Sequence, residues 1–151
     1  EGGWPGANPT DSEFFTAVPQ GRATMTAFGM TKRVGRSAQN DDVLAAVLDA
    51  GTPAVCLVGK CHDFHVTTAL GVSLEENLAA IAASFAHVVG QGREALFDAE
   101  HFFDGYRANP GYALACLQAA GTVLGLQATA TSVSDWLAQA VRAWRDTTLR
   151  Q

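Results

Sequence analysis

Strand-like apolar runs recur at roughly thirty-residue spacing along this chain, each followed by a loop and a helical pattern. The runs cover residues 23–28, 53–58 and 93–97. The second is apolar throughout, which is typical of a parallel strand buried on both faces. Long loops follow the strands and short ones precede them. This rhythm predicts βαβ units with right-handed crossovers, and the loop asymmetry favours a (β/α) barrel, whose site lies on the loops after the strands.

Helical patterns fill the stretches around these strands. Ser73 and Glu76 form a capping box at the start of one helix. Asn109 is expected to cap another, with Pro110 at its first helical position and Gly121 at its end. The sequence therefore predicts helices over residues 10–18, 41–50, 73–89 and 110–120.

The last thirty or so residues follow a different pattern. Residues 121–131 are small and weakly patterned, and Ser132 precedes a stretch with an apolar stripe at helical spacing that includes Trp136 and Trp144. We expect a closing amphipathic helix there. The predicted division is a partial barrel domain over residues 1–120 and a tail of uncertain origin over residues 121–151.

Composition limits the class of protein. The chain has 151 residues, 48% of them hydrophobic and 17% charged, which is typical of one globular domain. A net charge of −5 argues against a nucleic-acid surface, and no apolar run is long enough to span a bilayer. Three cysteines without a framework spacing predict reduced thiols in a cytoplasmic compartment.

Ionisable residues crowd the segment 98–110, between the third strand and the following helix. Glu100, His101 and Asp104 lie there among aromatic residues. Reactive groups of α/β proteins gather at the carboxyl ends of strands, and a carboxylate in apolar surroundings suits proton transfer. Two interpretations of Glu100 stay open: a catalytic carboxylate, or a structural partner of Arg107 or His101.

A second polar loop, residues 59–67, follows the second strand. It holds Lys60, Cys61, His62, Asp63 and His65. Cysteine, histidine and aspartate all bind metals, but the spacing matches no zinc pattern and a second ligand pair is missing. No glycine pattern of a nucleotide-binding loop occurs either. We therefore predict no metal site and no dinucleotide site from the residues of this chain.

Four segments, in order, resemble the citramalate, 2-isopropylmalate and homocitrate synthase superfamily. They are residues 1–9, 26–33, 59–67 and 97–110, and the last is the most specific. The resemblance covers about residues 1–120 and implies a TIM barrel. A complete barrel needs about 250 residues, so the chain is expected to be an internal fragment. The fold class it implies is α/β, a partial (β/α)8 TIM barrel of three to four parallel βα units plus a C-terminal helix.

The resemblance also implies an acyltransferase of amino-acid biosynthesis, on the isoleucine and leucine routes. Such enzymes condense acetyl-CoA with a 2-keto acid in a Claisen-type reaction and then hydrolyse the thioester; pyruvate is the best match here. A divalent metal (Mg, Mn or Zn) holds the keto acid in the family, but its Arg-Asp and His-x-His elements are absent from this chain. The isolated chain is therefore expected to be inactive. Expected partners are the keto acid, acetyl-CoA and a second copy in a homodimer or other homo-oligomer, with no nucleic acid and no membrane.

By the same resemblance Glu100 is the catalytic residue. The residues expected to bind substrate are Glu1, Lys60, Asp63, His65, His101 and Asp104. Two alternatives remain: a non-catalytic half-barrel that associates with itself, and an aldolase or lyase on the same scaffold.

Overall fold

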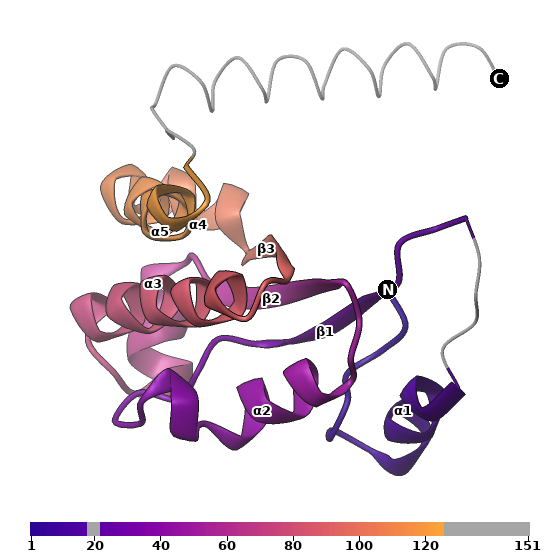
Figure 1. The fold of residues 1–151 in the computed structure, drawn as a ribbon. Helices are drawn as coiled ribbons and strands as arrows, with labels where there is room; N and C mark the ends of the chain where they lie inside the picture. The colour runs from indigo at the N-terminus through magenta and orange to yellow at the C-terminus, as the bar shows by residue number, and fades with distance from the viewer. Residues whose placement is uncertain (18–21, 126–151) are drawn as a thin grey trace, which may run out of the picture.

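The computed structural model describes residues 1–17 and 22–125 of the chain (Figure 1). Its centre is a three-stranded parallel sheet in the order β1-β2-β3. The strands are β1 Thr26–Met30, β2 Ala54–Lys60 and β3 Glu94–Glu100. The helices are α1 Pro9–Phe14, α2 Asp42–Asp49, α3 Leu74–Gly90, α4 Phe102–Ala108 and α5 Pro110–Val123. Shorter helical turns are η1 Phe15–Ala17, η2 Ala38–Asn40 and the π-helical η3 His65–Leu70.

Helices cover one face of the sheet. In-register pairing puts Gly29, Leu57 and Phe97 on that face. Val47 of α2 packs at Gly29, and the ring of Phe85 in α3 lies 5.2 Å from that of Phe97. Because α2 and α3 cover the same face, the sheet is built like a barrel wall and unlike a doubly wound sheet. The predicted α/β fold of a partial barrel is confirmed (Figure 1).

The opposite face, which we call the open face, carries Cys56 and Lys60 of β2 beside Leu96, Asp98 and Glu100 of β3. Along β3 this face is exposed, with Leu96 at 42%. We predicted that the third strand would end at residue 97, and this is wrong: β3 continues to Glu100. Alternating polar residues are what a strand with one open face requires, whereas the prediction took residues 93–97 to be a short buried strand.

The predicted loop 98–109 also contains a helix, α4, so the segment is mostly regular structure. The capping box of α3 is confirmed, with Ser73 Oγ accepting from the Glu76 N–H at 3.1 Å. The cap of α5 is confirmed too: Asn109 Oδ1 accepts from the Tyr112 N–H at 3.1 Å. Gly121 does not end this helix, because α5 continues to Val123 and the left-handed turn comes at Gly125.

The closing amphipathic helix predicted after residue 131 lies outside the described residues. The division of the chain at residue 120 stays a prediction. Among the helices of residues 1–17 and 22–125, none combines the length and apolarity that crossing a membrane requires.

Candidate active site

An ion pair joins the carboxyl ends of β2 and β3. Lys60 and Glu100 are opposite each other in the register, and their side chains form a salt bridge on the open face. Their side chains are 21% and 31% exposed, so both charges are partly removed from water. The partner of Glu100 is thus neither Arg107 nor His101, the two structural partners considered from the sequence. An ammonium and a carboxylate held together at this rim can bind a small anion and transfer a proton.

Three imidazoles form a row beside this pair. The His62 and His65 rings are stacked at 4.8 Å, and the His101 ring meets His65 edge-on at 4.5 Å. Partial removal from water, and then the neighbouring His101 and His62, lower the pKa of His65, while Glu100 acts in the opposite direction. The row therefore favours a neutral imidazole at its centre.

His101 occupies an unusual backbone conformation. Its φ of 56° lies in the left-handed region, where it is the only non-glycine among the described residues. Such conformations cost about 1–2 kcal/mol for a residue with a Cβ. This turn ends β3 after Glu100 and starts α4, so it directs the His101 ring toward His65.

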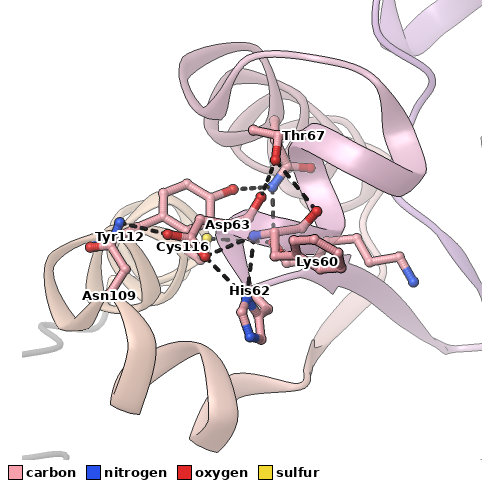
Figure 2. Close-up of polar contacts among 9 residues, drawn as sticks. Lys60, His62, Asp63, Thr67, Asn109, Tyr112 and Cys116 are labelled. Atoms are coloured by element: carbon pink, nitrogen blue, oxygen red, sulfur yellow. Dashed lines mark hydrogen bonds and ion pairs between the residues drawn. The ribbon is translucent and has the colours of Figure 1, made fainter.

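Asp63 organises the turn after β2. Its Oδ1 accepts from the Phe64 N–H at 2.7 Å and lies 3.1 Å from His62 Nδ1. Its Oδ2 accepts from Asn109 Nδ2 at 3.0 Å. These contacts, led by Asn109, lower the pKa of Asp63 and keep it a carboxylate. Figure 2 shows this group at the junction of β2 with the first turns of α5.

The end of β2 is fixed from the helix-covered side. Asn77 of α3, which is buried, donates to the Lys60 carbonyl at 2.9 Å and to Tyr112 Oη at 2.7 Å. Cys116 of α5 lies 3.6 Å from the same carbonyl (Figure 2). The Cys61 thiol donates to the Gly59 carbonyl at 3.5 Å, and the neighbouring Cys116 thiol together with burial raises the pKa of Cys61. Asn77, Tyr112 and Cys116 were not predicted as site residues, because in sequence they look like ordinary positions of two helices.

The N-terminal segment lies along β1. The Gly2 N–H donates to the Thr26 carbonyl at 3.0 Å, and the Phe28 N–H donates to the Gly3 carbonyl at 2.9 Å. The carboxylate of Glu1 lies next to the Cys56 thiol on the open face. Burial, and then Glu1, raises the pKa of Cys56 to about 12. Glu1 thus faces the same side of the sheet as Glu100 but contacts Cys56, not the Lys60–Glu100 pair.

The remaining predicted site residue, Asp104, lies in the first turn of α4 and is exposed. Asp104 forms no ion pair with another described residue. Its role in substrate binding stays a prediction. A cavity of about 410 Å³ opens beyond the end of β1, between Met30 and Leu70, with Lys32 and Arg33 in its lining.

The residues present do not form the metal site that the resemblance implies. Within residues 1–17 and 22–125, no three His, Cys, Asp or Glu side chains are grouped so that they could hold a metal ion. The His62 and His65 rings are stacked and the His101 ring meets His65 edge-on, which is not an arrangement of converging nitrogen ligands.

No model of a known protein family matches this chain. Several curated proteins named (R)-citramalate synthase are similar to it, among them three from different organisms. The protein of Streptomyces coelicolor is 49% identical over 124 residues, that of Synechocystis sp. is 50% identical over 123, and that of Aquifex aeolicus is 46% identical over 123. Each match covers 80% of this chain.

The chain belongs to the citramalate synthase family. It spans only about a quarter of the length of these relatives, with 23%, 22% and 23% covered in the same order. It therefore corresponds to a segment of a citramalate synthase, as the sequence predicted. The segment contains the strand ends that carry Lys60 and Glu100.

Proposed function

We propose that this chain is part of an acyltransferase that condenses acetyl-CoA with a 2-keto acid, pyruvate being the first candidate, and then hydrolyses the thioester. The observation that carries the proposal is the Lys60–Glu100 ion pair, which lies on the open face at the carboxyl ends of two parallel strands. In barrel enzymes this end of the strands carries the chemistry. The names of the relatives support amino-acid biosynthesis, and we extend this to the isoleucine and leucine routes in a cytoplasmic compartment.

The reaction requires that a proton leave the methyl group of acetyl-CoA and that negative charge develop on the keto oxygen of the acceptor. Glu100 is suited to accept or position a proton, and the ammonium of Lys60 to stabilise the developing oxyanion. His65 and His101 line the same rim and would contact the keto acid. A divalent metal in the complete enzyme would polarise the keto group, and its ligands would come from outside the described residues.

The test is a chimaera. The matched stretch of the Streptomyces coelicolor enzyme is replaced by the aligned stretch of this chain, and thiol release from acetyl-CoA is followed with and without pyruvate. We expect an active chimaera in which Glu100→Gln lowers kcat by about 100-fold or more. Glu94→Gln is the matched control, because Glu94 lies on the same face of β3 but at its amino end. Equal activity of the two variants would contradict the role of Glu100.

Association of the chain with itself is the second candidate, and the exposure of Leu96 on the open face favours it. An unpaired strand edge with an apolar residue beside it invites a second copy. We expect the isolated chain to sediment as a dimer or larger species and to release no thiol from acetyl-CoA. A monomer at all concentrations would exclude this candidate.

A further inference from the structure

Two segments that are distant in sequence meet at a single side chain. Asn109 lies between α4 and α5, 46 residues after Asp63, and its Nδ2 donates to Asp63 Oδ2 at 3.0 Å. The other end of the same amide caps α5, with Oδ1 accepting from the Tyr112 N–H at 3.1 Å. Figure 2 shows Asn109 between these two partners. The Asn109 amide thus donates one hydrogen bond to the turn after β2 and accepts another from the first turn of its own helix, α5.

Both carboxylate oxygens of Asp63 are, in turn, engaged by groups of the chain itself. One oxygen accepts from the Phe64 N–H at 2.7 Å and lies 3.1 Å from His62 Nδ1, and the other accepts from Asn109. These bonds fix the conformation of the turn that carries His62 and His65. The contacts favour a positioning role for Asp63 over the direct substrate contact expected from the resemblance.

We propose that Asn109 is a positioning residue that ties the His62–His65 turn to the β3–α5 segment and so holds the imidazole row against the Lys60–Glu100 pair. The row runs from His62 through His65 to His101, the residue that follows Glu100. The tie is the side-chain hydrogen bond between this turn and the start of α5, and it adds to the packing of α4 on the same turn at Gly105. The consequence for catalysis rests on the proposed function, whereas the tie is a property of the chain itself.

The dual use of Asn109 allows the tie to be separated from the helix cap. Asn109→Ser keeps a capping oxygen but is too short to reach Asp63, so it removes the tie without adding charge. Asn109→Asp also keeps a cap but places a second carboxylate against Asp63. The exchanged pair Asp63→Asn with Asn109→Asp restores a donor and an acceptor in reversed order.

The first readout is NMR of the 151-residue chain. Carboxyl ¹³C titration reports the pKa of Asp63, and imidazole resonances report His62, His65 and His101. We expect Asn109→Ser to raise the pKa of Asp63 toward its ordinary value, Asn109→Asp to raise it further, and both to shift the imidazole resonances. The exchanged pair should return the imidazole resonances to their original positions. Unchanged Asp63 and histidine signals in Asn109→Ser would overturn the proposal, as would failure of the exchanged pair to restore the histidine signals.

The second readout is the chimaera described above. We expect Asn109→Ser to lower kcat/KM by roughly tenfold to a hundredfold, with recovery in the exchanged pair, because small displacements of positioning groups have effects of this size. If Asn109→Ser keeps full activity while Glu100→Gln loses it, the positioning role is wrong and the proposed function stands. If the NMR signals respond but the chimaera itself releases no thiol with pyruvate, the proposed function is wrong and the tie stands.

Discussion

Gly105→Ala tests whether α4 packs as closely on the end of β2 as the structure shows. Gly105 is buried in α4, and a Cβ placed there would meet backbone atoms of the site turn: the carbonyl carbon of Cys61 at 2.9 Å and the Cα of His62 at 3.0 Å, with the Cys61 carbonyl oxygen closer still. Backbone atoms cannot change rotamer to make room. The helix itself must therefore move away.

Two effects of opposite sign determine the magnitude. Alanine favours a helix interior over glycine by about 1 kcal/mol, so propensity alone predicts a more stable protein. Carbon atoms in contact prefer about 3.5 Å, so α4 must recede by at least about half an ångström, and overpacking of this kind costs about 1–3 kcal/mol. Because the obstacle is backbone, we expect the overpacking to cost about 3 kcal/mol. The gain of about 1 kcal/mol from helix propensity reduces this to a net loss of stability of about 2 kcal/mol.

Urea unfolding followed by circular dichroism measures the difference. A loss of about 2 kcal/mol lowers the midpoint by roughly 1 M for a chain of this size. Gly111→Ala in α5 is the matched control, since the nearest atom to its added Cβ is Asn109 Oδ1 at 3.8 Å, an ordinary contact. The control should be as stable as the parent or more so. A Gly105→Ala variant at least as stable as the parent would refute the close approach of α4 to Cys61.

Three further predictions concern pH, thiols and a helix cap. The lowered pKa of His65 means that the folded chain binds fewer protons there than the unfolded chain, so stability falls as the pH drops through the ordinary value of 6.5; in urea titrations His65→Gln should flatten this slope. All three cysteines are free and buried, and burial raises the pKa of Cys56 to about 12, so a thiol reagent at about pH 8 should label them only after unfolding; fast labelling of the native chain would contradict this. Ser73→Ala should lower the free energy of unfolding by about 1 kcal/mol and speed amide exchange at Glu76, whereas Ser73→Thr should retain most of the cap.

Local signals in the sequence predicted most of the elements correctly. The apolar runs of β1 and β2, the capping box of α3 and the Asn109-Pro110 start of α5 each act within a few residues, so sequence alone was sufficient. The end of β3 was missed because it depends on a tertiary fact, namely which face of the sheet is open. The need for glycine at residue 105 has no local signal either, because the contact that requires it comes from Cys61, more than forty residues earlier.

The site was predictable to the extent that its residues carry ionisable groups near strand ends. Lys60, Glu100, His65 and His101 meet for that reason. The pairing of Glu100 with Lys60 follows from the strand register, which the sequence does not state. The tie between Asp63 and Asn109 could not be predicted, because asparagine at a helix cap looks complete without a second partner.

The two faces of β2 contribute differently to the site: one carries its charged groups, and the other fixes the backbone that holds them. On the open face the Lys60 side chain meets Glu100, while on the helix side the Lys60 carbonyl is held by Asn77. Substitution of the carboxylate therefore removes charge and leaves the frame intact. Substitution of Asn77 leaves every site charge in place but removes its hydrogen bonds to the Tyr112 hydroxyl and to the Lys60 carbonyl, which then keeps only the weak thiol donor of Cys116. We therefore expect substitutions on the open face to lower activity without lowering stability, and substitutions on the helix side to lower both together.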